Sequence, residues 1–375
     1  MASLDNQAAE TRDQRRLRAA RMPWWAWTWP LAACGVLAAA FAIGMNSALI
    51  AAAGVVLIAA VFAAVYHAEL IAHRIGEPFG SLVLALAVTV IEVALIVSVM
   101  LGGGAGSESL ARDTVFAAVM IILNGVVGLS LLIGGVSHHE QGFQAQGANA
   151  ALAVLAALLT LSLVLPNFTT STIGPEFSVS QLEFASVVSL VLYFTFLFVQ
   201  TVRHRDYFLT KVDGDGEVHA ARPSVVAALV SVVLLLVSLV SVVGLAKALT
   251  PAVDVGIDRL GAPKAVVGIV IAAVVLLPEG MAALRAARLN RLQTSMNLAL
   301  GSALASISLT IPAVAVVSVF LGTPLALGLD AKEEVLLSLT LLVSVMTLGT
   351  GRTTVLQGAV HLVILAVFLF LAIVP

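Results

Sequence analysis

Long apolar stretches separated by short polar or Gly/Pro-rich breaks run along almost the whole chain. Most are close to the roughly 20 residues that a helix needs to cross the hydrocarbon core of a membrane. Dividing the chain at its breaks predicts an all-α polytopic membrane protein with 11 transmembrane helices. The predicted spans are 26–44, 47–66, 79–102, 112–136, 147–165, 181–203, 223–249, 262–284, 295–321, 332–349 and 353–374.

Composition supports a lipid environment. Of the 375 residues, 60% are hydrophobic and 11% are charged, and the mean hydropathy is +1.08. Ordinary soluble domains carry about 25% charged residues. The net charge of −2 gives no reason to expect a nucleic-acid partner, and the composition makes lipid the expected partner. The single cysteine, Cys34, excludes an intramolecular disulfide framework and a cysteine-rich metal site, and no cofactor is expected.

The distribution of basic residues predicts the orientation in the membrane. With the N-terminus in the cytoplasm, 14 of the 19 Lys and Arg residues fall on the inner side, five of them in the tail. The tail lacks a convincing cleavage site for a signal peptide. We therefore expect a multi-pass protein of a bacterial inner membrane, with its N-terminus inside and its C-terminus outside. The sequence does not predict an oligomeric state.

The eleven predicted spans divide into one extra helix and two groups of five. Because five is odd, the second group must enter the membrane from the opposite side, which is the inverted repeat of many secondary transporters. The predicted domains are a cytoplasmic tail, an extra helix, a first repeat, a cytoplasmic linker and a second repeat, at 1–25, 26–46, 47–203, 204–222 and 223–375.

Two acidic residues occupy equivalent places in these repeats. Glu92 lies in the second helix of the first repeat, and Glu279 lies in the second helix of the second. They are the only acidic residues near the middle of any predicted span, and no Lys or Arg lies deep enough to neutralise them. An ionisable group at this depth costs about 2.5–3.5 kcal/mol on insertion scales. The pair is therefore expected to bind a proton or a metal cation in competition.

Neutral oxygen ligands are expected from nearby helices, because a hard cation such as Ca²⁺ takes six to eight oxygens. Asn124 lies in the third helix of the first repeat, and Ser306 lies at equivalent depth in the second. Ser302 and Thr310 stand one turn to either side of Ser306, on the same helix face. These hydroxyls could instead bond to their own helix carbonyls. Thr89, one turn before Glu92, is a further candidate.

Pro278 and Gly280 flank Glu279 and predict a locally broken helix, with backbone carbonyls exposed beside the acid. A simple packing kink is the alternative interpretation.

Other polar features have weaker interpretations. The acids of VDGDGEV (212–218) resemble a calcium loop but lack the length and final glutamate of an EF-hand. His138 and His139 follow the fourth span and are expected in water at the inner surface. His361, in the last span, is expected to be a satisfied packing residue away from the repeat-equivalent helices. A solvated loop at the inner side is expected to hold His67, Glu69, His73 and Glu77.

Two segments carry a resemblance to a known family. GEPFGSLVLALAVTVIEVALI (76–96) and VVGIVIAAVVLLPEGMAALRAARLNRLQTSMNLALGSALASISLTIPAVAV (266–316) resemble the two conserved repeats of the calcium/proton exchangers, within the calcium–cation antiporter superfamily. The sequence is most similar to the ChaA-type bacterial calcium/sodium–proton antiporters. The resemblance implies alternating access around a central site, with Glu92 and Glu279 as the paired acids and Asn124 and Ser306 as polar positions.

The chain departs from the commoner family pattern, in which an asparagine lies one turn before each glutamate. With fewer amide oxygens near the site, strict calcium selectivity is not expected, and the resemblance implies transport of monovalent cations as well. The predicted function is that of an antiporter that exports Ca²⁺, and also Na⁺ or K⁺ as alternative cargo, in exchange for protons. A monovalent cation/proton antiporter with little calcium transport and a cation channel are the alternatives. No enzyme is expected, because no nucleophile–base pair or phosphate loop lies in the membrane.

Overall fold

The computed structural model describes residues 22–76, 79–101, 108–209, 223–261, 263 and 265–374. The elements of this part are, in chain order, α2 (Trp24–Ile43), α3 (Ser47–Ile75), α4 (Phe79–Met100), α5 (Leu110–Met120), η1 (Ile121–Val126), α6 (Val127–His138), β1 (Gln141–Gly142), α7 (Ala145–Leu159), η2 (Thr160–Val164), η3 (Leu165–Phe168), α8 (Val179–Phe198), η4 (Val199–Arg203), η5 (Arg205–Tyr207), α9 (Val225–Leu260), α10 (Ala265–Arg288), α11 (Leu292–Leu321), α12 (Ala331–Leu348), β2 (Arg352–Thr353) and α13 (Val355–Ile373).

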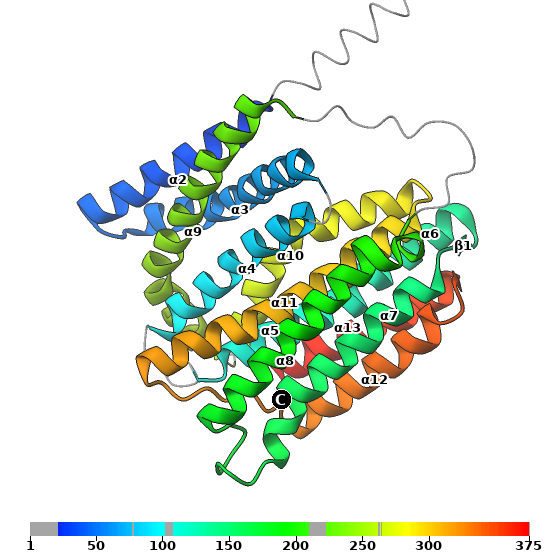
Figure 1. Cartoon of the computed structure of the whole chain (residues 1–375). Helices are drawn as coiled ribbons and strands as arrows, with labels where there is room; N and C mark the ends of the chain where they lie inside the picture. The colour runs from blue at the N-terminus through cyan, green and yellow to red at the C-terminus, as the bar shows by residue number, and fades with distance from the viewer. Residues whose placement is uncertain are drawn as a thin grey trace, which may run out of the picture. The chain divides into compact units, whose positions relative to one another are not determined.

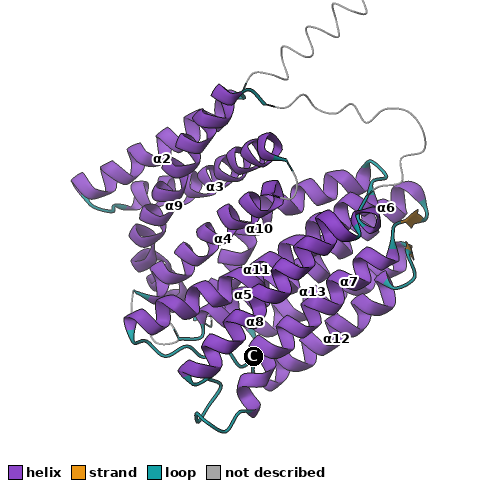
Figure 2. Cartoon of the chain, in the orientation of Figure 1, coloured by secondary structure: helices purple, strands orange, loops and turns teal. Residues whose placement is uncertain are grey.

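Long helices account for nearly all of these elements (Figure 2). The π-helical turns η1, η2 and η4 continue the helices that precede them, so the described residues form eleven long helices. Ten of the eleven are long and apolar enough to cross a membrane. The remaining helix, α12, carries three charged residues in its first turn, Lys332, Glu333 and Glu334. The eleven predicted segments are therefore confirmed as helices.

Two very short strands are the only sheet among the described residues. β1 pairs antiparallel with β2, with Gln141 opposite Thr353 and Gly142 opposite Arg352. The pair joins the loop after α6 to the loop before α13. It does not change the all-α character of the fold.

The chain forms two compact units. Unit 1 comprises Met1–Leu84 and Val218–Leu245, and unit 2 comprises Ala85–Glu217 and Ala246–Pro375. The boundaries fall within α4 and α9, so the units do not follow the predicted repeats. They group residues by spatial contact, whereas the predicted domains group them by repeat, and the domain boundaries remain a prediction.

Within unit 1, α2 packs against α3, and a buried histidine connects three helices. His67 of α3 is fully buried and its Nε2 donates to the Ala26 carbonyl oxygen of α2, 2.8 Å away. Its Nδ1 lies 3.1 Å from Ser231 Oγ of α9, so the hydroxyl donates to the ring. The expectation of a solvated loop is wrong for His67, because α3 continues to Ile75. Glu69 and His73 are exposed on the same helix, and Glu77 lies outside the described residues.

Replacing His67 with leucine should lower the stability of the folded protein by about 1–3 kcal/mol, because it leaves a buried carbonyl and a buried hydroxyl without their partner. Thermal unfolding of the purified protein in detergent would measure the loss. His73→Leu, an exposed change of the same kind on the same helix, is the control. Equal melting temperatures for the two variants would contradict the structural role given to His67.

Unit 2 holds the remaining helices. α10 packs against α5 and α11, α11 also packs against α7 and α8, and α13 packs against α6. α12 contacts both α7 and α13 (Figure 1). The core is formed by large side chains such as Phe116 and Met120, and the Phe116 ring meets Phe368 of α13 edge to face at 5.4 Å between centroids. The two predicted acids also lie in this unit, Glu92 on α4 and Glu279 on α10.

Candidate functional site

Glu92 and Glu279 line the same cavity in unit 2. α4 supplies Glu92, α10 supplies Glu279, and α11 supplies the hydroxyls of Ser302 and Ser306. Thr89, one turn before Glu92, also lines the cavity. The rest of the wall is apolar, from Ala85, Val88, Ala118, Ala272, Val275, Leu276 and Ala305. The two acids predicted from the repeat therefore meet in one pocket, although they are far apart in the chain.

The free volume of the cavity is about 10 Å³. That is near the minimum of roughly 10–15 Å³ that one water molecule requires. A hydrated ion does not fit in this space, so a cation entering it would exchange its water ligands for side-chain oxygens.

Glu92 is almost completely enclosed, with 2% of its surface exposed. Ser306 Oγ lies 2.7 Å from Glu92 Oε1 and 2.8 Å from Oε2, and donates to the carboxylate. Thr310 Oγ1, one turn further along α11, donates to Oε2 at 2.9 Å. Thr310 belongs to the series of hydroxyls, four residues apart, that the sequence places on this face of α11. The four-residue spacing from Ser306 was the signal that points to it.

Glu279 is half-buried and accepts a hydrogen bond from Ser302 Oγ. The hydroxyls of Ser302, Ser306 and Thr310 thus all face the acids rather than their own helix carbonyls. The spacing i, i+4, i+8 puts them in a row along one face of α11. A single helix, α11, therefore donates hydrogen bonds to both acids.

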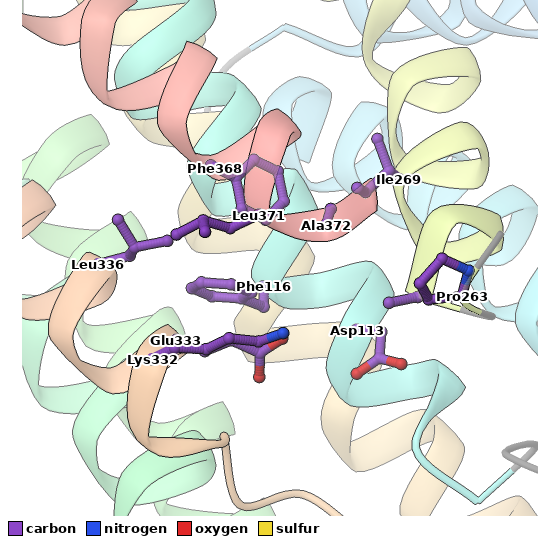
Figure 3. A pocket seen from close by; sticks show the side chains of 11 residues that line it. Asp113, Phe116, Pro263, Ile269, Lys332, Glu333, Leu336, Phe368, Leu371 and Ala372 are labelled. Carbon is purple, nitrogen blue, oxygen red and sulfur yellow. The ribbon is translucent and has the colours of Figure 1, made fainter. Parts of the chain in front are cut away.

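Asp113, elsewhere in unit 2, is an example of a carboxylate that is paired with a basic side chain. Asp113 lines a separate pocket with Phe116, Pro263, Lys332 and Glu333 (Figure 3). Its carboxylate accepts from Arg112 Nε at 2.8 Å and from Ser109 Oγ at 3.1 Å. Arg112 also donates to the Gly328 carbonyl oxygen at 2.8 Å. Asp113 is neutralised by a fixed cation, whereas no Lys or Arg of the described residues forms an ion pair with Glu92.

The chemistry of the cavity follows from this arrangement. A buried carboxylate that has no fixed counter-charge is strongly disfavoured unless a proton or a cation neutralises it. A hydroxyl can donate to a carboxylate or turn a lone pair toward a cation. The described residues contain no group of three or more His, Cys, Asp or Glu side chains that could hold a metal ion. A metal ion in this part of the chain would therefore be held by glutamate and hydroxyl oxygens, which are the ligands of hard cations.

The prediction for Asn124 is not matched by its position. Its side chain does not line the cavity with the two acids. Asn124 Nδ2 donates to Thr340 Oγ1 at 3.0 Å, and Asn124 Oδ1 lies 3.2 Å from His361 Nδ1. The π-helical turn η1, in which Asn124 lies, changes the side-chain phase and is not visible in the sequence pattern. His361 is satisfied as predicted, but the expectation that it lies away from the repeat-equivalent helices is wrong.

The expected break at Pro278 is also absent. α10 is continuous from Ala265 to Arg288 with Pro278 inside it. A proline removes only the helical partner of the carbonyl four residues earlier, here that of Val274. Gly280 is buried, and a methyl group added to it would lie 3.3 Å from Val126 Cγ2. Glycine at this position allows α10 to pack closely on η1.

Of the other weak candidates, those that the structure describes lie outside the cavity. The acidic segment 212–218 lies outside the described residues. His138 Nε2 donates to the Arg288 carbonyl oxygen at 3.1 Å, and His139 is exposed. His138 therefore bridges two helix ends rather than standing free in water.

Known proteins resemble this chain in sequence. A model of the family described as sodium/calcium exchanger protein matches residues 45–202 and 230–374. The y4hA protein of Sinorhizobium fredii is 52% identical over 364 residues, covering 96% of this chain and 99% of the relative. The sodium-potassium/proton antiporter ChaA of Escherichia coli is 36% identical over 316 residues, covering 84% of this chain and 85% of the relative.

Solved structures match the fold. The structure of native YfkE superposes with a TM-score of 0.73 at 18% identity, covering 93% of this chain and all (100%) of that one. The crystal structure of the H⁺/Ca²⁺ exchanger CAX superposes with a TM-score of 0.67 at 16% identity, covering 96% of this chain and 88% of that one. These matches confirm the polytopic all-α fold with one extra helix and two five-helix repeats. The chain belongs to the sodium/calcium exchanger protein family.

Proposed function

We propose that this protein is a secondary active antiporter that exports Ca²⁺ from the cytoplasm, with Na⁺ or K⁺ as further cargo, in exchange for protons. Glu92 and Glu279 bind the cation and the protons in competition. Two carboxylates balance one divalent cation or two protons, so each form leaves the cavity close to neutral. Alternating access would then present the loaded cavity to each side of the membrane in turn.

One observation carries the proposal. Two acids from equivalent helices of an inverted repeat line one buried cavity, and a row of hydroxyls on α11 is hydrogen-bonded to both of them. A structural role for Glu92 would call for a fixed cation, as at Asp113, but no Lys or Arg of the described residues forms an ion pair with Glu92. A channel would call for an open water-filled path, whereas the free volume here is about 10 Å³.

The names of two relatives support Ca²⁺, Na⁺ and K⁺ as the proposed cargo. ChaA of Escherichia coli is named a sodium-potassium/proton antiporter, and a relative from Aphanothece halophytica, 23% identical over 290 residues, is named a Ca²⁺/H⁺ antiporter. Glutamate and hydroxyl oxygens suit Ca²⁺ and the alkali cations alike. No enzymatic activity is proposed.

The proposed location is a bacterial inner membrane, with the N-terminus in the cytoplasm and the C-terminus outside. The distribution of Lys and Arg supports this orientation. A reporter fused to each terminus, one active only in the cytoplasm and one only outside, would test it.

Transport by the purified protein in liposomes tests the proposed function. Vesicles holding a pH-sensitive dye would be exposed in turn to Ca²⁺, Na⁺, K⁺ and Mg²⁺. We expect Ca²⁺, and one or both monovalent cations, to drive proton movement in the opposite direction. Movement driven by Na⁺ or K⁺ but not by Ca²⁺ would favour the monovalent antiporter. Cation flux that follows its own gradient without moving protons would favour the channel.

A further inference from the structure

The helix that runs from Leu110 to His138 is interrupted by the π-helical turn η1, Ile121–Val126. A π-helical turn accommodates an extra residue, is rare, and occurs frequently at functional sites. Ile122 and Val126 of this turn line a small cavity together with Glu279, Gly280 and Ser302. Glu279 and Ser302 also line the cavity that contains Glu92. The turn thus forms one wall of the space around Glu279.

The opposite side of the same turn carries Asn124. Ile122 and Asn124 are two residues apart and so point to roughly opposite sides of the helix. Asn124 is fully buried and its two side-chain atoms are held by different helices: Nδ2 donates to Thr340 of α12, and Oδ1 lies 3.2 Å from His361 Nδ1 of α13. His361, also fully buried, has its Nε2 3.3 Å from Thr347 Oγ1.

These contacts define the direction of each hydrogen bond. The Asn124 carbonyl oxygen can only accept, so His361 Nδ1 carries the proton. In a neutral imidazole Nε2 then accepts, and the Thr347 hydroxyl donates to it. Every polar atom of the imidazole is satisfied in one tautomer, which holds the ring in a single orientation against Asn124.

Close packing keeps α13 in place behind the turn. A methyl group added to Gly358 of α13 would lie 2.5 Å from the Leu132 nitrogen, and one added to Gly128 would lie 2.9 Å from His361 Cβ. Small residues at such contacts let membrane helices approach with their backbones nearly touching. α13 and α6 are therefore pressed together, and His361 has little freedom to follow the turn if it moves.

The π-helical turn η1 also contacts the backbone next to Glu279. A methyl group added to Gly280, the residue after Glu279, would lie 3.3 Å from Val126 Cγ2. A shift of η1 would therefore displace either α10 at Glu279 or the wall that Ile122 and Val126 present to it. An apolar residue at this buried position would need no hydrogen-bond partners, whereas an imidazole does, so a purely packing role does not account for this side chain.

We propose that Asn124 and His361 are positioning residues for the ion site: by holding η1 from behind, they set the shape of the cavity around Glu279 and thereby the affinity for the transported cation. The proposal rests on the exchange function proposed above. It assigns no contact with the cation to either residue.

Steady-state exchange in liposomes tests this, with the cation concentration varied. His361→Leu should raise the half-saturating cation concentration about three- to tenfold, the size typical of a mutation that acts through a neighbour, and leave the maximal rate within about twofold. His361→Asn, whose amide donor can occupy roughly the place of Nδ1, should recover most of the affinity. Asn124→Leu should match His361→Leu, and the double variant should be no worse than either single variant.

Ser130→Ala is the matched control. It also removes a buried hydrogen bond from the same helix, the 3.0 Å bond to Ser295 of α11, which does not involve η1. Melting temperatures should fall for both His361→Leu and Ser130→Ala, but the half-saturating concentration should change only for the first. Unchanged affinity in a folded His361→Leu protein, or an equal change in Ser130→Ala, would overturn the proposal. Absence of exchange by the unmodified protein would instead reject the proposed function.

Discussion

Replacing Glu92 with glutamine is expected to abolish cation-driven proton exchange, with a loss of at least about a hundredfold. The carboxylate is 2% exposed and its described partners are the hydroxyls of Ser306 and Thr310. A bound cation and Glu92 would form a buried charge pair, and losing one member of such a pair costs about 3–5 kcal/mol. Each 1.4 kcal/mol is about a factor of ten in binding. Glutamine can neither release a proton nor supply a full negative charge, so both halves of the exchange fail together.

The variant should still fold. Glutamine has nearly the shape of glutamate, and its amide can donate to the same hydroxyls when they turn to accept. The measurement is proton flux into dye-loaded liposomes after addition of Ca²⁺ and then of Na⁺ or K⁺. Glu140→Gln is the control, because Glu140 is an exposed acid whose ion-pair partner, Arg352, is 3.5 Å away. Exchange by Glu92→Gln at the level of the control would end the case for the ion site.

The fold was largely predictable from the sequence because lipid imposes a simple rule. Backbone polar groups in hydrocarbon must be satisfied within the chain, so each long apolar segment becomes a helix. The ends were less predictable. The end of the second predicted span illustrates this: the sequence predicts an end near residue 66, whereas α3 continues to Ile75. The charged and histidine residues within 67–74 suggest a loop, but this segment continues the helix, and His67 finds its partners on two other helices.

The two acids of the candidate site were predictable from the sequence, and the polar residues around them only in part. Glu92 and Glu279 stand out because charges are rare in membrane spans, and Ser302 and Ser306 follow from regular helical spacing on α11. Asn124 fails the same reasoning. The inference that it faces the acids assumed a regular α-helix, whereas η1 inserts a π-helical turn at this residue. Side-chain phase inside an irregular turn depends on packing that hydropathy does not report.

Glu279→Gln is expected to have a different effect from Glu92→Gln. With Glu279 replaced, the cavity retains one carboxylate, and the charge lost matters about twice as much for a divalent cation as for a monovalent one, because the Coulomb energy scales with the product of the charges. Ca²⁺-driven exchange should therefore fall by about a hundredfold or more. Na⁺- or K⁺-driven exchange should fall less, since a single carboxylate can still balance one monovalent cation or one proton.

Glu279 is suited to this asymmetry because it is half-buried, whereas Glu92 is enclosed and hydrogen-bonded by two hydroxyls. Water can partly solvate an unbalanced charge at residue 279 but not at residue 92. The measurement is the ratio of Ca²⁺-driven to Na⁺-driven proton flux in the same liposome preparation. Ser302→Ala is the control, because it keeps the charge of Glu279 but removes the hydroxyl that donates to it. Ser302→Ala should leave that ratio near its original value. Equal losses for both cations in Glu279→Gln would mean that the two acids act as one unit for every cargo, and charge balance would then not be the basis of cation choice.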